Sequence, residues 1–275
     1  MCRALKVSTS GYYAWRVRPE SARAQTDREL TRVIRRLHDQ SKGVYGSPKM
    51  HHELKDDGYQ CGRHKVARLM RLAGLRGCPK RRFRVTTQSD PSHPIAANLI
   101  DQDFTAKAPN QLWASDITYI PTHQGWLYLA VVMDLYSRRI VGWSMSRRMN
   151  RHLVIDALSM AVGARQPEGG LIHHSDRGSQ YTSDDFREAL EQQGIQCSMS
   201  GRGNCYDNAV VESFFGILKR ERVNRVRYRT REEARADVFE YIECFYNRQR
   251  RHGYLGNISP ATFEERTAGR YETVH

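Results

Sequence analysis

The segment Trp113-Ala-Ser-Asp116-Ile-Thr-Tyr-Ile120 decides the fold of this chain, because it places one acidic residue inside an otherwise apolar run. Its β-branched and aromatic residues favour a strand, a setting in which Asp is uncommon. A lone Asp in a strand is usually an edge or turn residue. Asp116 therefore needs acidic partners elsewhere in the chain before a chemical role can be assigned to it.

Two further acidic residues lie in distinctive contexts. Asp176 follows an apolar step in His173-His-Ser-Asp176-Arg-Gly178, and Glu212 lies in the helix-like stretch Asp207-Asn-Ala-Val-Val-Glu212-Ser-Phe-Phe215. There are 59 residues between Asp116 and Asp176, and 35 between Asp176 and Glu212. Three carboxylates suit phosphoryl transfer at a pair of metal ions, which activates the attacking oxygen and neutralises the leaving one. Mg²⁺ prefers such oxygen ligands and keeps several waters.

Other acidic residues have simpler explanations. Asp134 ends the apolar run 126–133 and precedes Ser137-Arg-Arg139, a pattern that predicts a hairpin turn. Asp184 and Asp185 follow Ser183 at the predicted start of a helix, where carboxylates favour the positive end of the helix dipole. We predict structural roles for all three.

The order of the predicted elements indicates the fold class independently of the acids. Three runs rich in β-branched and aromatic residues predict an antiparallel meander, and a helix, a strand, a helix, a strand and a helix follow. This order is that of the ribonuclease-H-like α/β fold, a mixed five-stranded sheet with flanking helices, in which acids of the first strand, the end of the fourth strand and a later helix converge. The predicted elements before the Glu212 helix are residues 111–120, 126–133, 140–145, 150–164, 171–174, 183–192 and 195–199.

The segments that flank the Glu212 helix also carry local signals. The glycine-rich loop from Ser200 to Tyr206 precedes it, and Asp207 is its expected N-cap. Farther along, Thr230-Arg-Glu-Glu233 matches a capping box and predicts a helix that runs to about Tyr246.

Residues 27–85 predict a small helical module. Leu30, Val33, Ile34 and Leu37 have the spacing of one buried helix face. Ser47-Pro48 supplies an expected N-cap and a proline at the first helical position, and a third helix over residues 63–73 ends at Gly74, a fitting C′ residue.

The third helix indicates contact with DNA. Basic residues are predicted on its exposed face, as in a helix-turn-helix whose last helix enters the major groove. A helical scaffold with a solvated basic face has the same pattern. The basic candidates are His64, Lys65, Arg68 and Arg71 on the helix and Lys80, Arg81 and Arg82 after it.

Composition agrees with a nucleic-acid substrate. The chain has 44 Lys and Arg against 30 Asp and Glu, a net charge of +14 and a pI near 9.7. Such an excess favours binding to a polyanion and predicts that this binding depends strongly on salt.

No run reaches the roughly 18 apolar residues of a membrane span, and the start lacks a signal peptide, so we expect a cytoplasmic protein. The six cysteines contain no Cys-x-x-Cys pair, and His51, His52, Cys61 and Cys78 lack zinc-site spacing.

The acid spacing and the sequence around each acid resemble the DD(35)E catalytic core of bacterial insertion-sequence transposases, a group related to retroviral integrases. Tyr45-Gly-Ser-Pro-Lys49 and Val66-Ala-Arg-Leu-Met70 are similar to the helix-turn-helix module that precedes this core. The ending near Tyr246-Asn-Arg248 is similar too, although the pattern departs over residues 253–258. The resemblance covers about Asp27 to Glu265.

This resemblance implies an enzyme that cleaves DNA at insertion-sequence ends and joins the freed 3′-hydroxyl to a new phosphate. Asp116, Asp176 and Glu212 would hold Mg²⁺, with Mn²⁺ as a substitute, and Arg177, Asn208 and Lys219 would position phosphates. The implied partners are the terminal inverted repeats, the target DNA and further copies of the chain assembled on DNA, in association with the nucleoid. In related elements this reading frame is often expressed as a fusion with an upstream frame, so an upstream-frame fusion partner is also implied.

The sequence predicts five regions. They are an N-terminal segment (1–26), the helix-turn-helix-like module (27–85), a polar, proline-interrupted linker (86–100), the ribonuclease-H-like core (101–222) and a C-terminal helical extension and tail (223–275).

Two other functions remain open at this point. A hydrolytic nuclease of the same fold would use the same acids with water as its only nucleophile, and a DNA-binding regulator would need none of them.

Overall fold

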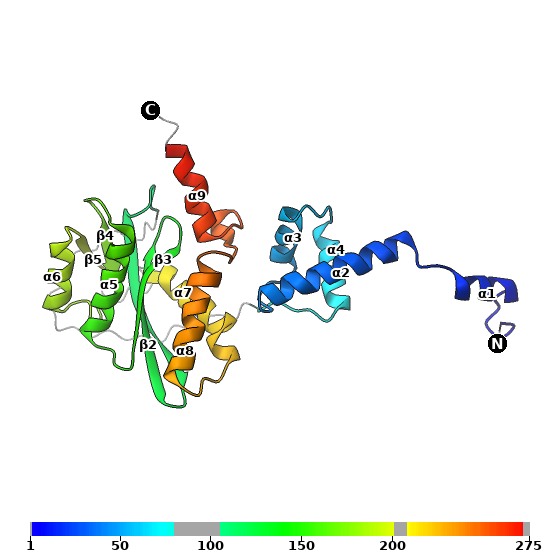
Figure 1. Ribbon diagram of the computed structural model, residues 1–275, viewed down its shortest axis with the longest axis horizontal. Helices are drawn as coiled ribbons and strands as arrows, with labels where there is room; N and C mark the ends of the chain where they lie inside the picture. Colours follow the sequence, from blue (N-terminus) through cyan, green and yellow to red (C-terminus); the bar gives the residue numbers. More distant parts are fainter. Residues whose placement is uncertain (1, 80–104, 201–207, 272–275) are drawn as a thin grey trace. The chain divides into compact units, whose positions relative to one another are not determined.

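The structure is a computed structural model that describes residues 2–79, 105–200 and 208–271 (Figure 1). The chain divides into two compact units, Met1–Pro79 and Lys80–His275, which are described separately below. The predicted linker at residues 86–100, most of the glycine-rich loop before the Glu212 helix, and Asp207 lie outside the described residues.

The N-terminal unit contains α1 (Thr9–Val17), α2 (Ala22–Gln40), α3 (Ser47–Asp56) and α4 (Arg63–Leu72). The three helices predicted between residues 27 and 73 are confirmed, but α1 and the start of α2 lie in the segment 1–26, for which no helix was predicted. The predicted apolar face of α2 is confirmed, because Leu30, Ile34 and Leu37 are buried and Val33 is half-buried. The buried residues of α3 and α4 complete this small core: Met50, Leu54, Val66, Leu69 and Met70.

The start of α3 differs by one residue from the prediction. Gly46, not Ser47, is the N-cap, since its backbone is extended while Ser47 is already helical. The chain that returns after α4 packs against this turn, where a Cβ on Gly77 would lie 2.4 Å from the backbone N of Gly46. Only glycine fits such a close approach between two backbones. The predicted C′ residue is confirmed, because Gly74 has a positive φ of 71° directly after the last turn of α4.

The C-terminal unit is built on a mixed five-stranded sheet with the order β3-β2-β1-β4-β5. The predicted meander is confirmed, because β1 pairs antiparallel with β2 and β2 antiparallel with β3. β1 and β2 run closer to each other than predicted, so that only His123 and Gln124 separate them. β4 pairs parallel with β1, and β5 parallel with β4. The strands are β1 (Leu112–Thr122), β2 (Gly125–Asp134), β3 (Arg139–Ser146), β4 (Ile172–Ser175) and β5 (Gln196–Met199).

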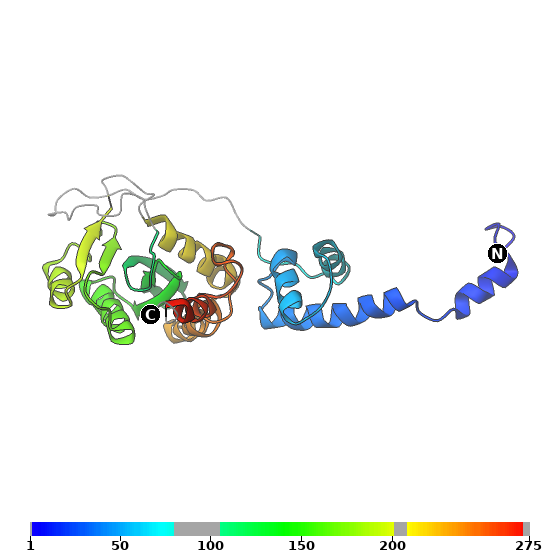
Figure 2. The ribbon, with the colours of Figure 1, turned by 90° about the horizontal axis from the view of Figure 1, so that it is seen from above.

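Helices cover both faces of this sheet (Figures 1 and 2). On one face, α5 (Arg151–Arg165) and α6 (Asp184–Gln192) enclose an apolar core that includes Trp113 of β1. On the other face lie α7 (Ala209–Glu221) and α8 (Arg231–Phe239). The layers and the strand order are those of the ribonuclease-H-like fold that the element order predicted.

The C-terminal extension packs back onto the core. Thr230 caps α8 as predicted, with its hydroxyl accepting the backbone N–H of Glu233, while the Glu233 carboxylate accepts the N–H of Arg229. The chain continues as a π-helix, η3 (Glu240–Tyr246), and later as α9 (Pro260–Tyr271). Glu264 of α9 accepts hydrogen bonds from Ser137, Arg139 and Arg165 and so fastens α9 to the turn after β2. None of the helices within the described residues is both long and apolar enough to cross a membrane.

Gly142 of β3 gives a direct test of the packing between α5 and the sheet. A Cβ at this position would lie 2.2 Å from the carbonyl oxygen of Ala157 and 2.7 Å from the Cβ of Ala161. Overpacking of this kind costs about 1–3 kcal/mol, so we expect Gly142→Ala to lower the free energy of unfolding by that amount in urea denaturation. Gly163, which lies on α5 itself, has no heavy atom within 4 Å of an added Cβ. Gly163→Ala should stabilise by about 0.5–1 kcal/mol, and equal effects of the two substitutions would contradict the packing described.

Candidate active site

The pairing of β1 with β4 brings two of the predicted acids together. Ser115 lies opposite Ser175 in this parallel pair, so the next residues on the two strands are Asp116 and Asp176. Neighbouring strands lie about 4.8 Å apart. The 59 residues between the two acids form the rest of the meander and α5, which bring the chain back to β1.

The third acid comes from the helix layer. Glu212 lies in the first turn of α7, and the start of this helix is tied to β1 because the Asn208 side-chain amide donates to the carbonyl oxygen of Ser115 over 3.1 Å. Ser115 directly precedes Asp116, so this bond sets α7 relative to the strand that carries the first acid.

The start of α7 corrects one expectation. Asn208 is the N-cap of the helix, the position predicted for Asp207. Its side chain is buried and its amide donates to β1, so it helps to position the helix that bears Glu212. Its contact with phosphate, which the resemblance implied, stays a prediction. A polar residue next to a helix start predicts a cap from the local sequence. The local sequence does not predict the bond to Ser115, which lies 93 positions away in the chain.

The electrostatics show that the three acids act on one another. Burial raises the pKa of the Asp116 carboxyl, and the charges of Asp176 and Glu212 raise it further, while Lys219 lowers it. Burial also raises the pKa values of Asp176 and Glu212, and for Glu212 the charge of Asp176 adds to the effect. Like charges brought close in a low-dielectric setting disfavour ionisation.

Backbone amides orient two of these carboxylates. Asp116 Oδ1 accepts from the N–H of Ile117 at 2.7 Å, and Asp176 Oδ1 accepts from the N–H of Gly178 at 3.0 Å. A Cβ on Gly178 would lie 3.1 Å from that same oxygen, which is tighter than most contacts of this kind. Glycine at 178 therefore keeps space open beside the Asp176 carboxylate.

The donor set fits a hard divalent cation. Within the described residues, no three His, Cys, Asp or Glu side chains already stand at metal-binding positions. The three acids nevertheless have the donor chemistry that such a cation prefers, and their charges raise the pKa of Asp116 and of Glu212. A bound divalent cation would replace their mutual repulsion with attraction, and all-oxygen donors suit Mg²⁺.

Two buried histidines behind the acids were not assigned by the sequence. His173 Nε2 lies 2.7 Å from Ser115 Oγ, and burial lowers the pKa of His173 to about 3, so this ring is neutral. The ring nitrogens of His174 lie 2.9 Å from Ser198 Oγ and 3.2 Å from Ser200 Oγ. These bonds link β1, β4 and β5 beneath the candidate site. The sequence signal was their place directly before Asp176 within a predicted strand.

The two basic residues proposed beside the acids have different surroundings. Lys219 Nζ lies 4.5 Å from the centre of the Tyr119 ring and near enough to Asp116 to lower the pKa of that carboxyl. Arg177 donates through Nε to the carbonyl oxygen of Ser200 at 2.6 Å, a bond that holds the end of β5. The contacts of these two residues with phosphate stay predictions.

The competing acids have the structural roles predicted for them. Asp134 is fully buried, accepts the backbone N–H groups of Asn110 and Tyr136, and pairs with Arg165. Asp184 and Asp185 lie in the first turn of α6, which Ser183 precedes as N-cap.

In the N-terminal unit, the basic face of α4 is smaller than predicted. His64 and Arg71 are exposed, but Lys65 and Arg68 are half-buried and both form ion pairs with Asp27 of α2. The expectation that all four are exposed is wrong for Lys65 and Arg68, since an acid 38 and 41 positions earlier in the chain holds them. Lys80, Arg81 and Arg82 lie outside the described residues.

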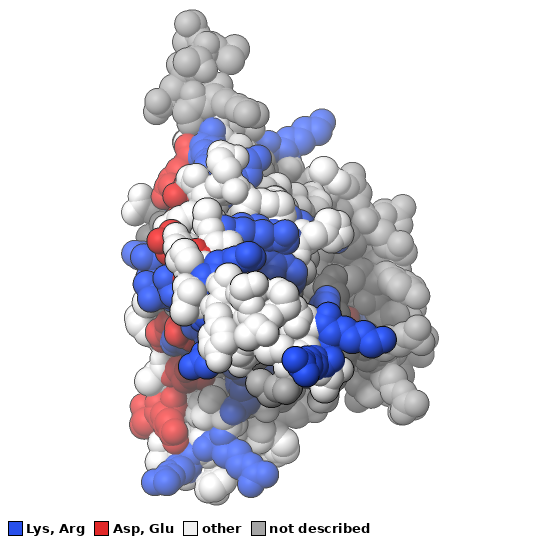
Figure 3. Space-filling view, turned by 90° about the vertical axis from the view of Figure 1, so that its right-hand side faces the viewer, with Lys and Arg blue, Asp and Glu red and all other residues white. Residues whose placement is uncertain are grey.

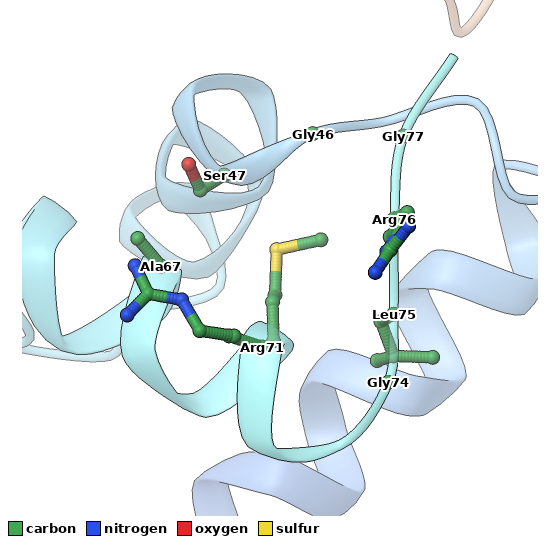
Figure 4. A pocket seen from close by; sticks show the side chains of 9 residues that line it. Gly46, Ser47, Ala67, Arg71, Gly74, Leu75, Arg76 and Gly77 are labelled. Atoms are coloured by element: carbon green, nitrogen blue, oxygen red, sulfur yellow. The ribbon is translucent and has the colours of Figure 1, made fainter. Parts of the chain in front are cut away.

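Arg71 borders a hollow of about 470 Å³ between the end of α4 and the start of α3. Figure 4 shows its guanidinium group near Ala67 and Ser47, with Arg76 on the opposite wall. Figure 3 shows Lys and Arg side chains spread over the described surface that faces the viewer. Two arginines at the mouth of one hollow favour an anionic ligand over an apolar one.

Comparison with known proteins agrees with both units. Residues 25–83 match the model of an HTH-like domain, and residues 106–205 and 212–267 match two models of the integrase core domain. The chain is 46% identical to transposase InsF of insertion sequence IS3A from Escherichia coli over 268 residues, which cover 97% of this chain and 93% of that protein. The chain belongs to the family of the IS3 transposases.

Other relatives of this transposase are similar over comparable lengths. It is 48% identical to an uncharacterized 31 kDa protein of insertion element IS600 from Shigella sonnei, over 97% of this chain and 98% of that one.

Among solved structures, the trimeric form of the HTLV-2 integrase catalytic core domain in complex with magnesium is similar, with 17% identity and a TM-score of 0.46. That similarity covers 58% of this chain and 99% of the other, and it is too distant to bear on the chemistry.

Removing one of the three charges should change the pH dependence of stability. A carboxyl with a raised pKa in the folded state stabilises the protein while it is protonated, and this contribution is lost as pH rises from the ordinary carboxyl range through the folded pKa. We expect metal-free Asp116→Asn to melt at a higher temperature than the parent at pH 8 and to differ little at pH 4. Asn keeps the oxygen that accepts the Ile117 N–H.

The matched control is Asp184→Asn, which removes an exposed charge at the start of α6. It should give no gain in melting temperature at pH 8. An Asp116→Asn variant that melts below the parent at pH 8 would show that burial and repulsion among the three acids do not destabilise the folded protein at this pH.

Proposed function

We propose that this transposase cleaves DNA at the ends of an insertion sequence and joins the freed 3′-hydroxyl to a new phosphodiester, using Mg²⁺ held by Asp116, Asp176 and Glu212. The observation that carries the proposal is the convergence of these acids from β1, the end of β4 and the first turn of α7, together with the raised pKa that each of them has. The family supports it, since its members include transposases.

The chain's own residues would perform most of the positioning. Bound Mg²⁺, or Mn²⁺ in its place, would activate the attacking oxygen and neutralise the leaving one in a two-metal arrangement. The backbone N–H groups of Ile117 and Gly178 hold the two aspartates in fixed orientations. Asn208 fixes the start of the helix that bears Glu212. Lys219 places a positive charge near Asp116, where it would attract a phosphate.

The proposed partners follow from the same assignment. The HTH-like unit and the net charge of +14 favour binding to DNA, and we propose the terminal inverted repeats and the target DNA as the bound sequences. Joining two element ends to one target requires both ends to be held together, which favours a homo-oligomer on DNA. We also propose that an upstream-frame fusion partner contributes to end recognition. No structural observation favours the hydrolytic nuclease or the regulator over the transposase.

The deciding experiment is a joining assay on a pre-cleaved element end with a free 3′-hydroxyl, in Mg²⁺. Asp116→Asn, Asp176→Asn and Glu212→Gln each keep the side-chain size and remove one charge, so each should lower joining by on the order of 100-fold or more while leaving DNA binding intact. Asp185→Asn, which alters an acid of the α6 first turn, should retain most of the activity.

Two outcomes of this assay would contradict the proposal. A parent protein that only hydrolyses the end, even with its upstream partner present, would indicate a nuclease. Any single acid variant that joins strands at nearly the parent rate would break the three-carboxylate assignment.

The basic face of α4 predicts different effects for two arginines one turn apart. Arg71 is exposed, so Arg71→Ala should weaken binding to duplex DNA and reduce the slope of log affinity against log salt by about one. Arg68 is paired with Asp27, so Arg68→Ala should lower the melting temperature of the protein and leave that slope nearly unchanged. Salt titrations by fluorescence anisotropy measure both slopes. If the two variants reduce the slope of log affinity against log salt by the same amount, the distinction between Arg71 and Arg68 is wrong.

A further inference from the structure

Two large aromatic side chains are exposed on the hairpin formed by β1 and β2. Tyr119 is 54% exposed and Trp126 is 48% exposed, and their ring centres lie 4.9 Å apart with the planes at 78°. An edge-to-face contact covers at most one face of one ring, so these half-exposed rings can offer a flat π-face to a ligand. Tyr119 lies three residues after Asp116 on the same strand.

The hairpin that carries these rings is held in place by Tyr228, which precedes α8, and by Arg231, the first residue of α8. Arg231 donates from Nε to the carbonyl oxygen of Trp126 at 3.0 Å, and the backbone N–H of His123 donates to the carbonyl oxygen of Tyr228, also at 3.0 Å. A bridge between Thr122 and Tyr228 adds to this anchoring. The two rings are therefore presented on a fixed scaffold, which lowers the entropy lost when a ligand stacks on them.

Lys219 connects the aromatic pair to the candidate active site. Its ammonium group lies 4.5 Å from the centre of the Tyr119 ring and acts on the pKa of Asp116. Residues 116 and 119 point to opposite faces of the strand. Lys219 of α7 nevertheless interacts with both of them. A positive charge between an acid cluster and an aromatic surface matches a ligand that has both a phosphate and a flat ring.

We propose that Tyr119 and Trp126 form a stacking platform for an unpaired nucleobase of the DNA substrate, with Lys219 beside the neighbouring phosphate. This inference rests on the proposed function, because it names the part of the DNA held next to the three acids. Aromatic side chains stack on single-stranded bases with little dependence on sequence, and a nearby cation adds to the attraction.

The separation along β1 limits which base is bound. Three residues of a strand span about 10 Å, which corresponds to about three base steps at 3.4 Å each. Because the ring and the acid lie on opposite faces of the strand, this span is a lower bound on the path between them, and the base on the platform lies a few nucleotides from the phosphate that reacts. An unpaired base costs least to extrude when it is already single-stranded, so a frayed or overhanging DNA end is the form that this platform selects.

The chain offers a matched control in Tyr254. This residue is 66% exposed, and the Arg138 guanidinium lies 4.4 Å from its ring centre. It therefore reproduces the pairing of an exposed tyrosine with a cation on another part of the C-terminal unit, within the segment η4 (Gly253–Leu255). Its ring has no part in the electrostatics of the three acids.

The test uses the full chain without divalent metal, so that no strand is cut, and DNA ends with 2-aminopurine placed one to four nucleotides from the 3′-terminus of an overhang. Stacking on the platform should quench 2-aminopurine at one or two of these positions. Tyr119→Ala with Trp126→Ala should abolish the quenching and weaken binding to the overhang at least about fivefold. Tyr119→Phe with Trp126→Phe should retain both effects, because the rings remain.

Tyr254→Ala should behave like the parent, and circular dichroism should show that every variant is folded. Quenching that survives the double alanine substitution, or a loss of binding of the same size in Tyr254→Ala, would overturn the proposal. It would also be overturned if the double alanine variant changed the oligomeric mass of the DNA-free protein and kept the quenching, since the rings would then contact a second copy. The quenching of 2-aminopurine is measured without metal and without strand cleavage, so it does not depend on the proposed reaction. A failure of that reaction would appear only in the joining assay.

Discussion

The parallel pairing of β4 with β1 is the constraint on which the candidate active site depends. It sets Ser115 opposite Ser175, and the two aspartates that follow become neighbours. A shift of one residue in this register would turn one of the two acids to the other face of the sheet. The buried bonds around the pair hold the register in place, since His173 bonds Ser115 from β4 and Asn208 bonds the same residue from the start of α7.

This register has an electrostatic cost. Three carboxyl groups are brought together where burial and their mutual charges raise their pKa values. The nearby histidine is neutral, because burial lowers its pKa to about 3, so it adds no balancing charge. The positive charge of Lys219 offsets part of this repulsion at Asp116, and a divalent cation bound between the acids would offset more of it. Acids with raised pKa values are a common feature of functional sites.

The sequence predicted the elements that follow a clear periodicity and missed the contacts made between distant residues. The meander and the buried face of α2 follow from the strand and helix patterns of their own residues, and the acid spacing singled out Asp116, Asp176 and Glu212 as the candidate site. The ion pairs of Lys65 and Arg68 with Asp27 could not be predicted, because no local pattern shows which of several acids on α2 will meet α4. The bond from Asn208 to Ser115 was missed for the same reason.

Whether these three acids form one cation site is measured most directly by the anomalous diffraction of Mn²⁺ in crystals of the chain bound to a DNA end. We expect an anomalous peak at coordination distance, about 2.0–2.2 Å, from carboxylate oxygens of both Asp116 and Asp176, with Glu212 completing the site. Mn²⁺ bound only at other residues, in crystals where the three acids are well ordered, would contradict it.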